Sequence, residues 1–373
     1  MISKSRKNAK CKDVEEVCRE GDLMSTTIYD GSPGVSSEVI SVDSLLERAR
    51  SSVDPLVAVA WYQEALRVDP DNTSIIGDTA GLMLQLGQTS TAQQLLMRSI
   101  EIAPEEGPEK YLYLAQLHEG HEALGFYEEA LKLLQQMESE SAQSKEKTAA
   151  IKQKICMAYC STGELFLTDL CFETDAEQRC QDALDKSMVY DYGGPEPLHT
   201  LANLRLSQRD LESAIGAAEE AFKRLEFCDP PCEHEFRVSL AKVLIECSDS
   251  ESGCCDKALK ILSGILQEDD ENVEVWYLMG VAFNRLRPPD HESARDHLKT
   301  AADMLEKIRK RQKEVDETFD FQEQVRLVRE QMEMSTLLAK REGDPNAQDG
   351  DESPATSTSD LANVEQGGAM SCG

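Results

Sequence analysis

The stretch "AWYQEALRVDPDN" at residues 60–72 shares its arrangement of residue types with "LLMRSIEIAPEE" at residues 95–106. The shared order is small, large, small and then proline: Ala58, Tyr62, Ala65 and Pro70 in the first copy, and Ala92, Leu96, Ser99 and Pro104 in the second. Positions three and four residues apart lie on one face of a helix, and a proline ends the helix that precedes it. The sequence therefore predicts a helix that recurs with a period of 34 residues.

That period and those residue types are typical of the second helix of the tetratricopeptide repeat. The first helix is clearest in "VWYLMGVAFNRL" at 275–286, where Trp276, Met279, Gly280 and Phe283 have the expected spacing. Further copies are marked by Leu114, Ala115, Ala123, Tyr127 and Ala130; by Gly163, Ala176, Cys180 and Ala183; by Leu201, Ala202, Ala214, Ala218 and Ala221; by Leu240, Ala241, Ala258 and Leu262; and by Ala294, Leu298 and Ala301. We predict an all-α tetratricopeptide-repeat superhelix of about seven helical pairs.

Composition divides the chain into four expected segments. Residues 1–40 and 342–373 are rich in Gly, Ser, Asp and Pro or lack a helical period, so we expect a disordered N-terminal segment and a disordered acidic tail. The superhelix is expected over 41–306. Residues 307–341 have the composition of a long helix and are expected to cap the solenoid, with a break near Thr318.

The sequence contains no run of about 20 apolar residues and no apolar segment behind the charged N-terminus, so we expect neither a membrane helix nor a secretory signal. We accordingly expect an intracellular protein whose 12 cysteines are thiols.

One cysteine group is a candidate zinc site. Cys228, Cys232 and His234, joined by Cys247, Cys254 or Cys255, are possible ligands. The alternative, which the lack of any repeated ligand spacing favours, is that these are small loop and core residues, as are Cys156 and Cys160. Because no phosphate-binding loop, nucleophile elbow or metal-binding histidine motif is present either, we predict no enzyme activity, no metal and no cofactor.

The charge is the most informative property that remains. The chain has 70 Asp and Glu against 39 Lys and Arg, a net charge of −31. This imbalance repels nucleic acid and anionic membranes and attracts cationic partners. The alternative is that the acidic surface serves solubility alone.

The register of the repeats places four glutamates, Glu109, Glu196, Glu235 and Glu274, in the first turn of successive first helices, which line the concave groove of such a solenoid. We predict that they bind a partner there, together with Gln116, Glu119, Asp169, Asn203, Glu246, Tyr277 and Asn284. The alternative for the glutamates is that the helix dipole favours an acid in the first turn whatever the groove binds.

The same register disfavours a co-chaperone that grips acidic chaperone tails, since that role requires a clamp of lysines, arginine and asparagines. The fifth and ninth positions are instead Leu112 and Gln116, His199 and Asn203, Val238 and Lys242, and Tyr277 and Val281.

Three phrases are more specific than the general repeat: "EEGPEKYLYLAQL" at 105–117, "GELFLTDLCFETDAEQRCQDAL" at 163–184 and "LANLRLSQ" at 201–208. With the short third repeat, they resemble the tetratricopeptide assembly chaperones of the large-subunit ribosomal protein L-four.

The resemblance implies that the chain captures that newly made protein, covers its long basic internal loop and escorts it from the cytoplasm to the nucleus for incorporation into pre-60S ribosomes. It implies no direct binding to nucleic acid or membrane, and we expect a monomer before the client binds. Lys4, Arg6, Lys7, Lys10 and Lys12 are either a nuclear-entry signal or part of a solvated tail. A general tetratricopeptide scaffold in another complex remains the alternative function.

Overall fold

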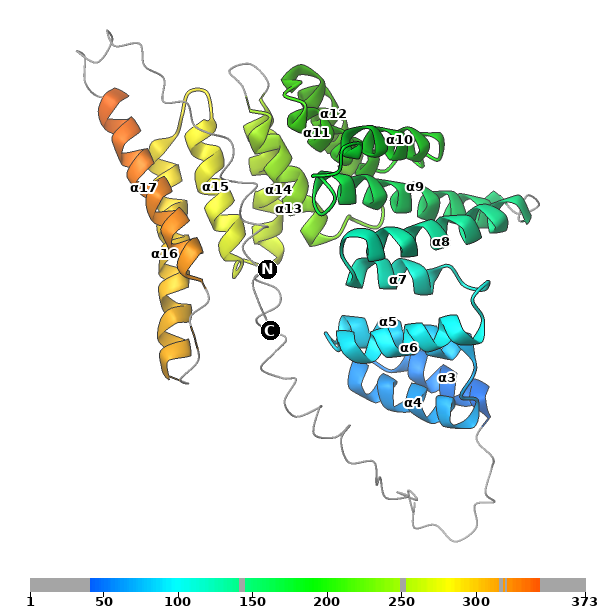
Figure 1. The fold of residues 1–373 in the computed structure, drawn as a ribbon. Coiled ribbons are helices and arrows are strands. Elements are labelled where there is room, and N and C mark those ends of the chain that lie inside the picture. Colours follow the sequence, from blue (N-terminus) through cyan, green and yellow to red (C-terminus); the bar gives the residue numbers. More distant parts are fainter. Residues whose placement is uncertain (1–40, 141–144, 249–252, 315–317, 319–320, 343–373) are drawn as a thin grey trace.

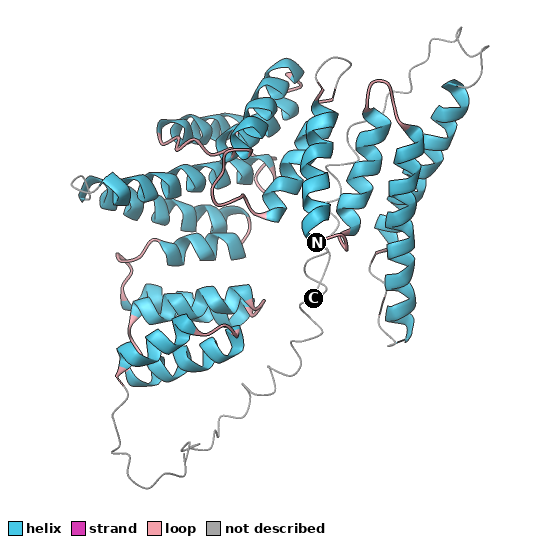
Figure 2. Ribbon diagram, turned by 180° about the vertical axis from the view of Figure 1, so that it is seen from behind, coloured by secondary structure: helices cyan, strands magenta, loops and turns pink. Residues whose placement is uncertain are grey.

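The computed structural model describes residues 41–140, 145–248, 253–314, 318 and 321–342. Every regular element in these ranges is an α-helix (Figures 1 and 2). In chain order they are α3 (Val42–Ser51), α4 (Pro55–Val68), α5 (Thr73–Gln85), α6 (Thr89–Ile102), α7 (Glu109–Leu117), α8 (Gly120–Glu140), α9 (Lys145–Leu167), α10 (Ala176–Val189), α11 (Glu196–Ser207), α12 (Leu211–Leu225), α13 (His234–Glu246), α14 (Cys254–Glu268), α15 (Val273–Arg285), α16 (His291–Glu314) and α17 (Gln322–Glu342).

These helices form seven consecutive antiparallel pairs, from α3 with α4 to α15 with α16, and α17 packs on α16 and α15 at the end. The pairs stack in sequence and curve into an arch (Figure 1). The prediction of an all-α tetratricopeptide superhelix of about seven pairs with a helix at its C-terminal end is therefore confirmed.

Local chemistry sets where many of the helices begin. The side chains of Asp54 and Asn72 accept hydrogen bonds from backbone N–H groups in the first turns of α4 and α5, and Asn272 does the same for α15. These bonds satisfy N–H groups that have no partner inside the helix. Gly87 (φ 75°) adopts the left-handed conformation directly after α5 and lets the chain turn back into α6.

The repeated small and large residues form the core. Ala65 and Ala92 are fully buried, and Leu96 fills the space between its neighbours with no exposed surface. The small residues of the later copies are buried in the same way: Ala123, Ala130, Cys180, Ala202, Ala214, Ala218, Ala221, Ala241, Ala258, Ala294 and Ala301. Each pair thus packs its two helices closely through small side chains, as the repeat pattern predicts.

Gly280 shows how close this approach is. A Cβ atom added to Gly280 in α15 would lie 2.5 Å from Cγ of Leu298 in α16 and 3.1 Å from the carbonyl oxygen of Ala294. The glycine of the first-helix pattern is therefore required by the packing of the second helix against it.

The C-terminal end differs in detail from the expected boundary at residue 306. Helix α16 continues to Glu314 and α17 begins at Gln322, and Thr318 belongs to neither helix. Leu305 and Val328 are buried where α16 and α17 meet. Of the expected disordered segments 1–40 and 342–373, Glu342 is the last residue of α17 and the rest lies outside the described residues.

Candidate protein-binding surface

The four predicted glutamates each lie in the first turn of a first helix: Glu109 in α7, Glu196 in α11, Glu235 in α13 and Glu274 in α15. Their register is as the repeat predicts. Their chemical surroundings differ, because three of the four interact with another side chain of this chain.

Two of these glutamates pair with lysines of neighbouring repeats. Nζ of Lys154 in α9 lies 2.5 Å from Oε1 of Glu109, and Nζ of Lys242 in α13 lies 2.8 Å from Oε1 of Glu274. All four side chains keep more than a third of their surface in solvent. Exposed pairs of this kind contribute little stability, so both carboxylates can exchange their lysine for another cation.

Glu196 accepts a hydrogen bond from the hydroxyl of Tyr192, in the loop that precedes α11. Burial raises the pKa of that hydroxyl, and the bond to Glu196 raises it further, so Tyr192 stays a donor. Arg224 in α12 fixes the same loop, because its Nη1 lies 2.9 Å from Oδ1 of Asp191. Glu235 is exposed, and no ion pair to it is found among the described residues.

Glu196, Glu235 and Glu274 belong to a larger acidic surface. The loops between successive pairs and the helix ends beside them, residues 190–196, 224–237 and 266–274, lie along one edge of the stack, and we call these residues the acidic edge. Its carboxylates are Asp191, Glu196, Glu226, Asp229, Glu233, Glu235, Glu268, Asp269, Asp270, Glu271 and Glu274. Its lysines and arginines are Arg224 and Arg237 alone, and each pairs with a carboxylate of the edge itself. The acidic edge therefore has a large excess of negative charge.

Other predicted residues lie farther along the same helices. Gln116 and Asn203 are seven residues after Glu109 and Glu196, and Glu246 is eleven residues after Glu235. Because seven and eleven residues are close to whole helical turns, each follows its glutamate on one helical face. Partial desolvation raises the pKa of the Glu246 carboxyl, and Arg285 and Lys242 oppose that shift. The predicted set thus forms bands about 10–17 Å long, each running along a first helix.

Two predicted acids lie at the opposite ends of the pairs, where a first helix turns into its second. Glu119 is exposed in the short turn between α7 and α8. Asp169, just after α9, accepts a hydrogen bond of 2.9 Å from the backbone N–H of Gly120. This bond caps the start of α8 across the repeat boundary, so Asp169 has a structural role that the sequence pattern did not indicate.

The last first-helix, α15, is partly covered by α17. Nδ2 of Asn284 donates a bond of 2.6 Å to Oγ of Ser335 in α17, and Oδ1 of Asn284 lies 2.9 Å from Nδ1 of His291. Burial raises the pKa of Tyr277 to about 12. Asn284 therefore joins the capping helix to the last pair, and its amide is occupied within the chain.

The sequence did not predict several other residues of this surface. It overlooked Lys154 as a partner of Glu109, and it overlooked Glu164 in α9, whose side chain is 47% exposed and accepts a bond of 3.1 Å from Thr200. Phe227 and Val189 are exposed apolar residues at or next to the acidic edge, at 85% and 79%. No signal in the repeat pattern marks them, since they stand in loops or at helix ends where the pattern is silent.

The candidate zinc ligands are split by the length of α13. Cys228, Cys232 and His234 stand at its start, whereas Cys247, Cys254 and Cys255 stand beyond its end. A helix of 13 residues is about 20 Å long, so one ion cannot contact both groups. Within the described ranges no group of three or more His, Cys, Asp or Glu side chains is arranged to hold a metal. Cys156 and Cys160 are buried in α9, as a core role requires.

Three of the positions that would form the clamp of the disfavoured co-chaperones are buried: His199 at 4% exposure, Val238 at 5% and Val281 at 4%. None of the helices described here has the length and apolar character that crossing a bilayer requires.

With the fold and this surface in view, comparison with known proteins gives a consistent result. A probable assembly chaperone of rpl4 from Schizosaccharomyces pombe is 28% identical over 252 residues, which cover 65% of this chain and 72% of that protein. Its counterpart from Emericella nidulans is 27% identical over 262 residues, covering 63% of this chain and 64% of that protein. This chain is similar to assembly chaperones of rpl4. No family model matches it.

A solved structure agrees. The assembly chaperone of RpL4, Acl4 (residues 1–338), superimposes with a TM-score of 0.58 and 26% identity, covering 67% of this chain and 98% of that one. The resemblance to tetratricopeptide assembly chaperones is therefore confirmed in both sequence and fold. Such chaperones are a non-enzymatic class of repeat scaffold.

Proposed function

We propose that this chain is a dedicated chaperone that binds a newly made large-subunit ribosomal protein of the L4 type. The observation that carries the proposal is the similarity to assembly chaperones of rpl4, which extends over about two thirds of the chain in sequence and in fold. A general repeat fold alone would not select this client, because many unrelated functions share it.

The part of the client that this chain binds is its long basic internal loop. The acidic edge supplies more carboxylates than arginines and lysines, and Glu274 within it, like Glu109 outside it, is held by an exchangeable lysine partner. Opposite charges speed the encounter and select basic segments over others. Phe227 offers an apolar contact beside these charges. The remaining members of the predicted surface, Gln116, Asn203 and Glu246, extend it along the first helices.

The same charge accounts for the rest of the proposed cycle. A basic loop that will meet ribosomal RNA would otherwise bind RNA nonspecifically, and an acidic cover competes with that binding. A net charge of −31 keeps this chain itself away from nucleic acid and anionic membranes. The chain, a monomer before it meets its client, escorts the client from cytoplasm to nucleus and releases it to pre-60S particles.

The test is affinity purification of the tagged protein from its own cells at several salt concentrations, with quantitative mass spectrometry. We expect one near-equimolar basic ribosomal protein of the L4 type that is lost as the salt concentration rises. Recombinant client without its internal loop is the matched control and should bind far more weakly. A set of non-ribosomal subunits in fixed ratio, insensitive to salt, would instead identify a general scaffold.

A further inference from the structure

The cysteines of the chain are not equally accessible. Among the described residues, Cys156, Cys160, Cys180, Cys247, Cys254 and Cys255 are buried, whereas Cys171, Cys228 and Cys232 are partly exposed. Cys171 stands by itself in the turn after α9. Cys228 and Cys232 are the partly exposed cysteines that share one loop, the sequence "CDPPC" between α12 and α13.

The two thiols of this loop interact with each other. They are close enough for Cys228 to raise the pKa of Cys232, and Sγ of Cys228 donates a bond of 3.4 Å to the carbonyl oxygen of Arg224 in the last turn of α12. Two neighbouring, partly exposed thiols on one loop can approach to the distance that a disulfide requires. The buried pair Cys156 and Cys160 is different, since both are enclosed in the core on one continuous helix.

We propose that Cys228 and Cys232 are a redox modification site, which hydrogen peroxide converts to a disulfide within the loop. The thiolate sulfur of one cysteine attacks the peroxide oxygen, the O–O bond breaks, and a sulfenic acid and a water form. The second thiol then attacks that sulfur, displacing the hydroxyl group as a second water. One peroxide is reduced and two thiols are oxidised, with no further reactant.

The two cysteines have different parts in this reaction. Burial raises the pKa of Cys232 to about 12, and its contact with Cys228 raises it as well. The attacking form of a cysteine is its thiolate, so Cys232 is the poorer nucleophile toward peroxide. Cys228 is therefore the residue that is oxidised first, and Cys232 resolves the sulfenic acid.

The disulfide would fix a stretch of the acidic edge. Glu226, Asp229 and Glu233 belong to this loop, and Glu235 follows it in the first turn of α13. The redox site stands on its own geometry and does not depend on which client the acidic edge binds.

Peptide mass spectrometry tests the proposal on the full chain, reduced, freed of reductant and treated with hydrogen peroxide. We expect the peptide that contains residues 228–232 to lose two hydrogens and to regain them with dithiothreitol. Cys171→Ser should leave this loss unchanged, while Cys228→Ser and Cys232→Ser should each abolish it. Peptide-level assignment separates these residues from Cys11, Cys18 and Cys372.

Trapping with dimedone tests the separate roles. Cys232→Ser should accumulate a dimedone adduct on Cys228, and Cys228→Ser should leave Cys232 with none. Both variants should keep the far-ultraviolet circular dichroism of the parent chain, which shows that they are folded. Free thiols at both positions after peroxide treatment, or oxidation of Cys228 that proceeds to the sulfinic acid without a disulfide in the parent chain, would overturn the proposal.

Discussion

Nζ of Lys242 in α13 lies 2.8 Å from Oε1 of Glu274 in α15, so a single ion pair joins the first helices of two successive repeats. The lysine occupies the ninth position of one repeat pattern and the glutamate the second position of the next. A cation from this chain thus already stands where a basic client side chain is proposed to bind.

Removing that lysine should strengthen client binding. In Lys242→Gln the Glu274 carboxylate is released and the surface gains one negative charge. We expect tighter binding of the client's basic loop, chiefly through faster association, and a change in the free energy of unfolding within about 1 kcal/mol, because the pair is partly exposed. Surface plasmon resonance at several salt concentrations measures this.

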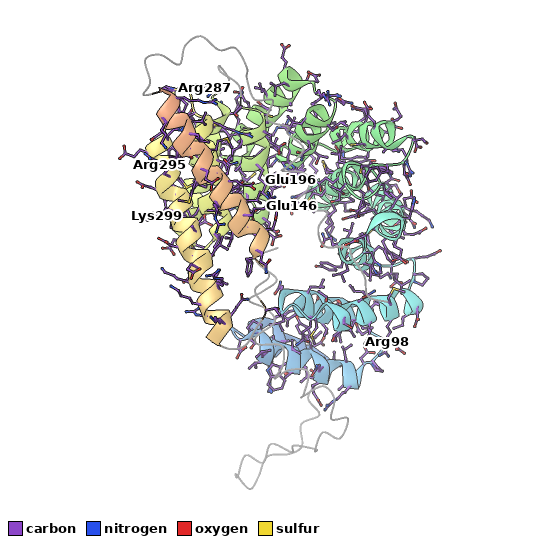
Figure 3. All side chains as sticks on the ribbon, turned by 60° about the vertical axis from the view of Figure 1, so that its left-hand side comes forward. Arg98, Glu146, Glu196, Arg287, Arg295 and Lys299 are labelled. Atoms are coloured by element: carbon purple, nitrogen blue, oxygen red, sulfur yellow. The ribbon has the colours of Figure 1, made fainter. Side chains whose placement is uncertain are left out.

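The matched control is Lys299→Gln, which makes the same change of charge on an exposed side chain of α16. In Figure 3 Lys299 and Arg295 lie at the outer edge of the molecule beside α16, whereas Glu196 is labelled within the array of helices. Equal gains in the two variants would mean that net charge alone, and not the position of Glu274, governs binding.

Reversing the charge of the acidic edge should abolish client capture. Glu196→Lys, Glu235→Lys and Glu274→Lys combined place three cations where a basic loop would lie, so we expect no measurable binding in the pull-down assay at moderate salt. Helicity and melting temperature should be nearly unchanged, since these side chains lie at or near the surface. The control is Glu101→Lys, Glu128→Lys and Glu212→Lys, exposed positions on second helices with the same total change of charge. Retained capture in the first variant would exclude these glutamates from the binding surface.

His199 should make stability fall in mild acid. Burial lowers its pKa to about 4, and its Nδ1 has no hydrogen-bond partner, while Oε1 of Glu164 is 3.8 Å away. The unfolded chain takes up this proton near pH 6.5 and the folded chain does not, so stability is complete above pH 6.5 and is lost as the pH falls from 6.5 toward 4. The loss should reach about 2 kcal/mol at pH 5.

Urea unfolding at pH 7.5 and pH 5.0 measures this change, and the difference between the parent chain and His199→Gln isolates the histidine from the carboxylates that also titrate. We expect the drop in the free energy of unfolding to be smaller in His199→Gln. An equal drop in both proteins would show that His199 is not responsible.

The repeat pattern predicted the fold well because packing alone decides it. Ala65, Leu96 and Ala214 are buried where the spacing places them, since a small or large side chain at those positions is fixed by the neighbouring helix. The partners of the surface residues could not be predicted in the same way. The pairing of Lys154 with Glu109 and the capping of α8 by Asp169 depend on how successive helix pairs are rotated and on loop lengths. Both of these vary between repeats.

Gly280 provides the sharpest test of the packing itself. Gly280→Ala would bring a Cβ atom to 2.5 Å from Cγ of Leu298 and 3.1 Å from the backbone oxygen of Ala294, so α16 must move away from α15. We expect a loss of about 1–3 kcal/mol in the free energy of unfolding, as overpacking of a core typically costs. Gly216→Ala is the control, because Gly216 is an exposed helical glycine in α12 with no atom within 4 Å of the added Cβ, and it should stabilise the chain by about 0.8–1 kcal/mol. Denaturant unfolding followed by circular dichroism measures both, and a Gly280→Ala chain as stable as the parent would mean that the two helices are less closely packed than this structure shows.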